Sequence, residues 1–379
     1  MNNKFSKIFS AVAVVLLLVL SVSALILPLA TPDKEYSETE NRYLAGFPDM
    51  NLKAVLSGRF MTDFEEYLSD HFSFRDNIVS AKTFIARILG KTEVNNVYIG
   101  KDNRLFEVPS RLDDENTAEI IDSINSFSEK CGIENQYFLL APNASYVHSE
   151  FLPDALVAEN QREIINTISD ELSEKLSTVD VCLPLIKHND ELLYFRTDHH
   201  WTHKGAYYAF EELSRAMKLD GDAVSYEEIV FSNGFSGTLA SSSGINEAYD
   251  KLCAYVPEDY LGKYYVYNYA TQEKSPSVFD LTKLENKNQY EVFFGGNFGR
   301  IAIHTDNMNE KYLLIFKDSY ANSLIPMLIP HFEKIVVIDP RYFTEDISNI
   351  LADDNFTHLL FLYNLNTLLD DTVLKDALS

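Results

Sequence analysis

The strongest constraint on the fold is an alternation of short apolar runs with segments of helical spacing, most regular in the C-terminal part of the chain. Apolar runs of four to eight residues are typical of buried strands, and strands separated by helices form parallel sheets with helices on their faces. The alternation therefore predicts an α/β fold with a parallel sheet flanked by helices. The predicted strands are 136–141, 179–185, 312–316, 335–338 and 358–363, and the predicted helices are 115–130, 159–176, 205–217, 320–329, 344–351 and 368–378.

Residues 220–305 interrupt the alternation with Tyr-rich segments that Gly and Ser punctuate. This composition is typical of hairpins, so we expect a β-rich insertion on the α/β body. Two interpretations of its aromatic residues stay open. They could stack on sugar rings, or they could pack against one another as the core of a small β subdomain.

The N-terminal stretch from Ile8 to Ala30 carries no charge, follows Lys4 and Lys7, and is long enough to cross a bilayer once. We expect residues 1–31 to form a cytoplasmic stub and transmembrane anchor, with the C-terminal body in the extracytoplasmic space. A cleaved signal peptide is the alternative, since residues 22–24 (VSA) resemble a cleavage site. Residues 32–58 then form a tether, and residues 59–379 form the main domain, which begins with two helices, 59–72 and 77–89.

Charge and cysteine content exclude several functions. A formal net charge of -25 argues against nucleic acid, because phosphates would be repelled. Cys131, Cys182 and Cys253 do not match a disulfide framework or a metal-binding pair. His199, His200 and His203 could bind zinc, but the sequence offers no second cluster of Cys, His or Glu at ligand spacing beside them. We therefore expect neither a metal nor a cofactor.

One short stretch, 194–208 (YFRTDHHWTHKGAYY), holds three of the nine histidines and the only tryptophan. A second, 312–322 (YLLIFKDSYAN), reads as a buried strand that ends just before Ser319. Together they contain a hydroxyl, an imidazole and a carboxylate, the groups of a Ser-His-Asp acyl-transfer site. If the first stretch is extended, Asp198 and His200 face the same way. His199 is the rival base if the stretch turns sharply, and Ser319 alone reads more simply as a helix N-cap.

At TDHHWT the chain resembles the bacterial DHHW family, which is related to the alginate O-acetyltransferase proteins of the SGNH-hydrolase-like superfamily. The resemblance extends over an ordered set of segments: ENRYLAGFPD, FEEYLSDHFSFRD, YFRTDHHWT, GFSGTLAS, FFGGN, KDSYAN and DPRYF. It implies an SGNH-like fold and a serine acetyltransferase or acetylesterase that acts on an extracellular polysaccharide. It also implies an integral-membrane O-acyltransferase as the acetyl donor.

The resemblance places Ser319 as nucleophile, His200 as base and Asp198 as the group that orients it, with Trp201 completing the motif. Where SGNH enzymes commonly carry Gly-Asp-Ser, this chain has Lys317 before Asp318, so the oxyanion hole is an open question. The candidate donors and substrate contacts are the Ser319 N–H, Gly295, Gly296, Asn297, Asn322, Trp201 and Arg341. Arg341 also reads as an ion-paired scaffold residue, as does Arg196.

Three functions remain at this stage. The first is an O-acetyltransferase that works through an acetyl-serine, and the second is an acetylesterase with the same triad. The third is a catalytically idle glycan-binding or assembly protein. Asp318 is expected to cap the helix that follows it rather than to act in the triad.

Overall fold

A computed structural model describes residues 14–15, 36–37, 42–48, 50–71, 75–219, 224–258 and 262–379. The chain divides into two compact units between Lys91 and Thr92, and residues 241–245 belong to the first unit. Among the described residues, no helix has the length and apolar character needed to cross a bilayer. Apart from Val14 and Val15, the predicted anchor lies outside the described residues and stays a prediction.

The first unit contains two short strands and three helices in its described part, including the two helices predicted beyond residue 59. They are β1 (Tyr36–Ser37), β2 (Arg42–Tyr43), α2 (Leu52–Leu56), α3 (Arg59–Asp70) and α4 (Arg75–Ile88). Phe47 packs edge-on against Phe64 and Tyr67 of α3.

The second unit is built on a sheet that has eight strands in the described part of the chain, in the order β11-β10-β12-β14-β13-β15-β6-β7. Its strands are β6 (Asn135–Ala141), β7 (Leu176–Thr178), β10 (Tyr264–Asn268), β11 (Glu273–Ser275), β12 (Arg300–Thr305), β13 (Tyr312–Lys317), β14 (Lys334–Ile338) and β15 (His358–Asn364). From β14 to β7 the pairing is parallel, as predicted. The other three strands are antiparallel, so the sheet is mixed rather than parallel throughout.

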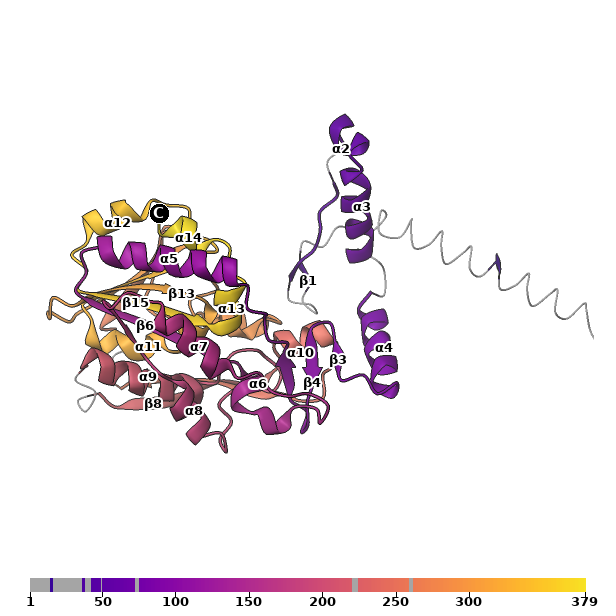
Figure 1. Ribbon diagram of the computed structural model, residues 1–379, viewed down its shortest axis with the longest axis horizontal. Helices are drawn as coiled ribbons and strands as arrows, with labels where there is room; N and C mark the ends of the chain where they lie inside the picture. Colours follow the sequence, from indigo (N-terminus) through magenta and orange to yellow (C-terminus); the bar gives the residue numbers. More distant parts are fainter. Residues whose placement is uncertain are drawn as a thin grey trace, which may run out of the picture. The chain divides into compact units, whose positions relative to one another are not determined.

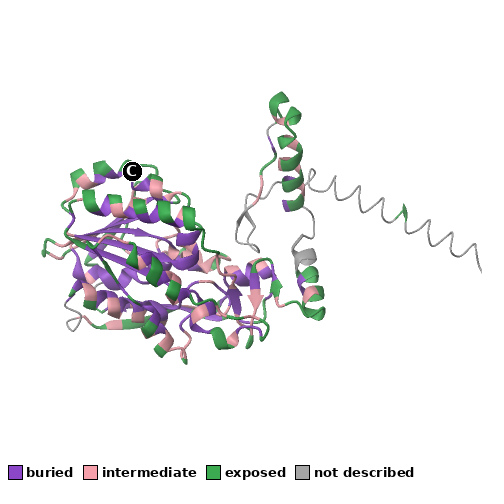
Figure 2. Cartoon of the chain, viewed as in Figure 1, coloured by how far each residue is buried: buried purple, intermediate pink, exposed green. Residues whose placement is uncertain are grey.

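Helices cover both faces of this sheet. In Figure 1, α5, α12 and α14 lie on one face, and α9 and α11 lie on the other. Side chains of the central strands β12, β14, β13, β15 and β6 alternate between two buried clusters: Leu313 and Ile315 of β13 face α11, whereas Leu314 and Phe316 face α5. Burial on both faces explains why the strands read as continuous apolar runs (Figure 2). The described helices are α5 (Asp114–Lys130), α6 (Ala144–Val147), α7 (Gln161–Asp170), α8 (Cys182–Lys187), α9 (His203–Met217), α10 (Thr238–Ser243), α11 (Ile325–Leu328), α12 (Ile347–Asp353), α13 (Leu365–Leu369) and α14 (Leu374–Ala377).

Residues 220–305 are β-rich, as predicted, but they are not one insertion. Strands β8 (Tyr226–Phe235) and β9 (Asp250–Pro257) pair only with each other, whereas β10, β11 and β12 join the main sheet. One face of the β8–β9 pair packs with Phe195, Tyr290 and Phe293 in a third buried cluster. This part of the region therefore packs its aromatic residues inside, although Tyr249 and Tyr265 stay exposed. Another small sheet contains β3 (Glu93–Val94), β4 (Val97–Ile99) and β5 (Leu105–Glu107).

Two predictions between residues 159 and 187 are wrong. The helix α7 ends at Asp170, and the strand that follows is β7, at 176–178. The apolar run predicted as a strand at 179–185 instead contributes to the short helix α8. Short apolar runs fit a buried strand and a buried helix equally well, so periodicity could not separate the two.

Candidate functional site

The candidate site lies at the carboxyl ends of the parallel strands. Ser319 follows β13, Asp339 follows β14, Asn143 follows β6, and β15 ends at Asn364. Open α/β sheets bind their ligands at this edge, because loops and helix starts converge there.

Ser319 is fixed by the residue before it. Asp318 is buried, and its carboxylate accepts hydrogen bonds from the backbone N–H groups of Tyr320 (2.8 Å) and Asn364 (2.7 Å). Burial raises the pKa of Asp318. The residue thus caps the turn, as predicted, and also ties it to β15, while Ser319 itself stays partly exposed.

The helix predicted at 320–329 is instead a series of short pieces. They are a 3₁₀ helix at Ser319–Ser323 (η5), α11, and a second 3₁₀ helix at Ile329–His331 (η6). An element as short as η5 has little macrodipole, so an oxyanion would depend on individual N–H groups.

The stretch that carries the histidines is a closed loop rather than an extended segment. Tyr194 and Trp201 form an antiparallel bridge, and the Phe195 N–H donates to the His200 carbonyl (3.2 Å). Asp250 holds the loop from the side of β9, because its carboxylate accepts bonds from the Thr197 N–H (2.9 Å) and from Arg196 (3.1 Å). Arg196 is therefore a scaffold residue.

The loop brings Asp198 and His200 together through a tight local turn. One oxygen of Asp198, Oδ1, accepts from the backbone N–H of His200 (2.9 Å) and lies 2.6 Å from its Nδ1. His200 Nε2 lies 2.7 Å from Ser319 Oγ. With the proton assigned to Nδ1 by the carboxylate contact, Nε2 is the acceptor for the serine hydroxyl. The three predicted side chains thus form one continuous hydrogen-bond chain.

The second oxygen of Asp198 is held by residues that the sequence did not single out. Oδ2 accepts from the N–H (2.8 Å) and the hydroxyl (3.0 Å) of Thr238. Gly237 permits this contact, because a Cβ there would lie 2.3 Å from Asp198 Oδ2. Although burial opposes its ionisation, His200, His199 and these hydrogen bonds lower the pKa of Asp198. Gly237 and Thr238 both belong to the GFSGTLAS segment, and the family resemblance of that segment was the sequence signal that could have pointed to them.

The imidazole of His200 is enclosed by aromatic rings. Tyr290 stacks on it with ring centroids 3.9 Å apart, and the Tyr290 hydroxyl donates to the Ser319 carbonyl (3.2 Å). Burial and the neighbouring His199 lower the pKa of His200 to about 4, against the pull of Asp198. The imidazole is therefore neutral at pH 7, the form that a general base requires. Nothing in the sequence marked Tyr290.

The family model described as DHHW protein matches residues 136–338, which is more than half of the chain and includes both the loop and Ser319. The chain belongs to the DHHW family. A crystal structure of a DHHW family protein from Eubacterium siraeum matches with a TM-score of 0.61 and 28% identity, over 76% of this chain and 95% of that chain.

Two further solved structures match the chain. Bacillus cereus PatB1 with a sulfonyl adduct has a TM-score of 0.63 and 20% identity, over 74% of this chain and 97% of that chain. The O-acetyltransferase domain of Pseudomonas putida AlgJ has a TM-score of 0.46 and 14% identity, over 73% of this chain and 93% of that chain. No curated protein matches the chain.

Within the DHHW motif, Trp201 is not placed to contact a substrate. Its side chain is fully buried, and its Nε1–H donates to the Tyr320 carbonyl (2.9 Å) and lies 3.0 Å from Ser323 Oγ. The Tyr320 hydroxyl returns a hydrogen bond to the His199 carbonyl. These bonds connect the DHHW loop to η5, so Trp201 sets the position of the base relative to the nucleophile.

The other histidine of the motif lies beside the triad and outside its hydrogen-bond chain. His199 Nδ1 lies 2.8 Å from Thr238 Oγ1, and its side chain is partly exposed. The turn therefore does not make His199 the partner of Ser319.

The oxyanion candidates separate into used and unused donors. The Gly296 N–H donates to the Phe293 carbonyl (3.2 Å), in a turn where Gly296 has a φ of 128° that favours glycine. Asn322 is buried and donates its Nδ2 to Asn297 Oδ1 (3.1 Å). The Gly296 N–H is therefore used, and so is one of the two Asn322 Nδ2 hydrogens. In the described part of the chain, the Ser319 N–H and Asn297 Nδ2 donate to no protein acceptor.

Arg341 forms a two-pronged ion pair. Its Nε and Nη2 donate to the two oxygens of Asp339 (2.8 and 2.7 Å), and about a third of its side chain is exposed. This contact gives Arg341 the scaffold role that was one of its two interpretations.

Two groups of described side chains have the composition of metal ligands. One is Asp198, His199 and His200, whose polar atoms already serve the triad, and the other is His203, Glu228 and Cys253. In the second group Glu228 contacts His203 (3.1 Å) and also pairs with Lys251. The ammonium group of Lys251 therefore already neutralises the Glu228 carboxylate.

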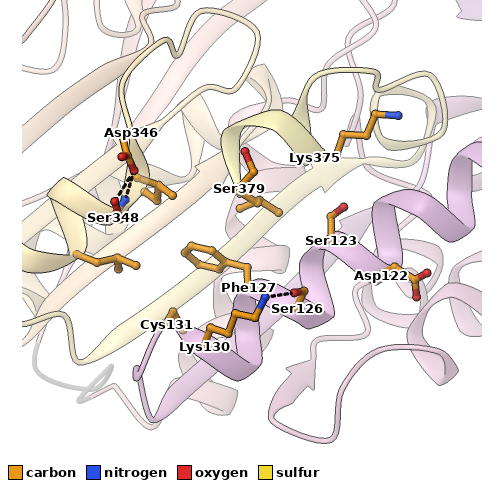
Figure 3. Close-up of a pocket in the computed structure, with 13 residues that line it drawn as sticks. Asp122, Ser123, Ser126, Phe127, Lys130, Cys131, Asp346, Ser348, Lys375 and Ser379 are labelled. Carbon is orange, nitrogen blue, oxygen red and sulfur yellow. Dashed lines mark hydrogen bonds between the residues drawn. The ribbon is translucent and has the colours of Figure 1, made fainter.

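A separate cavity of about 780 Å³ lies between α5, α12 and α14 (Figure 3). Its lining includes Phe127, Lys130, Ile347 and Leu378, and no triad residue. It is therefore distinct from the candidate site.

Proposed function

We propose that this DHHW protein is a serine-dependent O-acetyltransferase that acts on a cell-surface or secreted polysaccharide. The observation that carries the proposal is the hydrogen-bond chain from Asp198 through His200 to the partly exposed Ser319 hydroxyl. A buried carboxylate, a neutral imidazole and a serine in this order form an activated nucleophile.

The chain of residues supports a two-step transfer. Ser319 Oγ attacks the acetyl carbonyl of a donor while its proton moves to His200 Nε2. The tetrahedral intermediate collapses, the donor's leaving group departs with that proton, and acetyl-Ser319 remains. A sugar hydroxyl then gives its proton to His200 and attacks the acetyl group, which releases Ser319 and yields the acetylated sugar. Water in place of the sugar gives the acetylesterase reaction with the same residues.

Localisation and partners belong to the same proposal. The uncharged N-terminal stretch and its basic flank support an anchored protein whose catalytic unit is extracytoplasmic. In that setting the acetyl group is delivered by an integral-membrane O-acyltransferase. The solved relative with a sulfonyl adduct supports the choice of chemistry, since sulfonyl reagents modify activated nucleophiles.

The test is turnover of a chromogenic acetyl ester by the purified full chain, with and without added oligosaccharides. We expect release of the chromophore that depends on Ser319 and His200, and acetylated oligosaccharide as the product when a suitable acceptor is present. Release without acetylated sugar for any acceptor would favour the esterase. No release, together with glycan binding that Ser319→Ala leaves unchanged, would favour the idle binding protein.

A further inference from the structure

Lys317 is a buried cation two residues before Ser319. Its side chain is almost fully covered, and its Nζ lies 3.0 Å from Asp339 Oδ2 and 3.0 Å from Asn297 Oδ1. Burying an ammonium is costly, and here burial lowers the pKa of Lys317. The need to neutralise Asp339 does not account for the burial of Lys317, because Arg341 already donates to both oxygens of that carboxylate.

The contact with Lys317 determines which way the Asn297 carboxamide is turned. A lysine ammonium donates and never accepts, so the Asn297 atom beside Nζ must be the carbonyl oxygen. The other terminal atom is then the NH₂ group, whose hydrogens have no acceptor among the described residues. A neutral partner at 317 would not make this choice, because the two ends of a carboxamide are nearly equal in shape.

Asn322 shows that the orientation is imposed. It must also donate to Asn297 Oδ1, which leaves its own Oδ1 buried without a partner. If both amides were turned over, the Asn297 NH₂ group could donate to Asn322 Oδ1 instead. The Asn297–Asn322 pair alone therefore permits either orientation, and Lys317 selects one of them.

We propose that Lys317 is a positioning residue that fixes the Asn297 carboxamide with its N–H groups directed to the acyl carbonyl at Ser319. Asn297 Oδ1 contacts Lys317 and Asn322, which flank Ser319 in the chain, so the carboxamide lies at the nucleophile turn. This inference rests on the proposed acyl chemistry. It assigns the residue that replaces the usual glycine a role in shaping the oxyanion hole.

The test is a double-mutant cycle in the full chain with Lys317→Met, Asn297→Ala and the double variant, read as kcat and KM for a chromogenic acetyl ester. Asn297→Ala should lower kcat by about 10²-fold, as loss of one oxyanion donor does. Lys317→Met should lower kcat by about two- to tenfold, because the Asn297 carboxamide is then divided between two orientations. KM should stay within about twofold in both variants, since the lost contact forms mainly in the transition state.

The decisive result is non-additivity: in the Asn297→Ala background, Lys317→Met should cause no further loss. A wild-type kcat in Lys317→Met, or a double variant that loses the product of both factors, would overturn the positioning role. A thermal melt checks folding, which should persist because Arg341 still pairs Asp339. Lys317→Gln, which fills the space but can present oxygen or nitrogen, replaces the Met variant if the latter does not fold.

A second readout does not need turnover and separates this inference from the proposed function. A neutron structure locates amide deuterons, and in Lys317→Met it should show both carboxamides turned over in a measurable fraction of the molecules, with the Asn297 nitrogen toward Asn322 Oδ1. An unchanged amide would refute the inference alone. An inactive wild type with the amide turning as expected would refute the acyl chemistry alone.

Discussion

The two groups of residues that serve Ser319 are fixed in different ways. On the base side, formed by Asp198, His200 and Thr238, both carboxylate oxygens accept two hydrogen bonds each. On the amide side, formed by Lys317, Asn297 and Asn322, both contacts converge on a single oxygen. The base side is therefore complete without substrate, whereas the amide side keeps an unused donor. That contrast is what a site would need if one side works on the serine proton and the other on the charge that develops later.

The largest expected effect comes from breaking the base side at Asp198. Asp198→Asn removes the charge and can donate to His200, which favours the wrong tautomer, so kcat should fall by about 10⁴-fold. Turnover of the acetyl ester measures it. Asp346→Asn is the matched control, because Asn caps α12 as well as Asp does and the position does not line the triad. A loss of less than tenfold in Asp198→Asn would show that the carboxylate does not orient the base.

Gly237→Ala disturbs the base side by a steric clash with Asp198. The added methyl group would lie 2.3 Å from Asp198 Cβ, so the carboxylate must move, at a cost of about 1–3 kcal/mol. We expect kcat to fall by about tenfold or more and the melting temperature to drop. Gly234→Ala, in the same segment, is the control, since nothing lies within 4 Å of its added carbon. Equal behaviour of the two variants would contradict the close approach.

Tyr290→Phe sharpens the comparison, because Tyr290 contacts His200 by its ring and Ser319 by its hydroxyl. The substitution keeps the stacked ring and removes one hydrogen bond, a change of about 1 kcal/mol. We expect kcat to fall by no more than about fivefold. The exposed Tyr265, stacked on His304, provides Tyr265→Phe as the control. A loss as large as that of Asp198→Asn would give the hydroxyl a direct part in catalysis.

The pH profile tests the base side without a mutation. Because burial lowers the pKa of His200 to about 4, the base should stay neutral, and kcat/KM level, as the pH falls from 7 to about 5.5. The rate should halve only near pH 4. The lowered pKa also makes the free energy of unfolding depend on pH. Its contribution is complete above the pKa of about 6.5 that His200 has in the unfolded chain, and it is lost as the pH falls toward 4. An acid limb centred near 6.5 would mean that the imidazole is not desolvated.

Sequence patterns predicted the triad residues better than their arrangement. Asp198, His200 and Ser319 were found from residue types and an ordered set of motifs, whereas Thr238 was not, and β13, β14 and β15 were found from apolar runs. The reason given for the convergence of Asp198 and His200 was wrong, since the loop closes on itself instead of running extended. Turns of this kind depend on contacts with distant residues such as Asp250, which periodicity does not report.

The amide side was harder to predict for a physical reason. Gly295, Gly296 and Asn297 were all possible donors, with Asn322 as a weaker candidate, and only the hydrogen bonds show which of these donors are already used. The individual antiparallel strands β10, β11 and β12 were not located from the sequence, because they have fewer consecutive buried residues than β13. Tyr290 stands three residues before the FFGGN segment but outside it, and the packing of η4 (Gln289–Val292) brings its ring to the site.

The most direct test of the account is to locate the acyl group. The full chain is mixed with a chromogenic acetyl ester, quenched during turnover, and analysed by intact-mass spectrometry and peptide mapping, beside Ser319→Ala and His200→Ala. The account predicts one acetyl adduct, on the peptide that contains Ser319, in the wild type and in neither variant. An adduct on another residue, or equal labelling of all three proteins, would contradict the assignment of Ser319 as a nucleophile activated by His200.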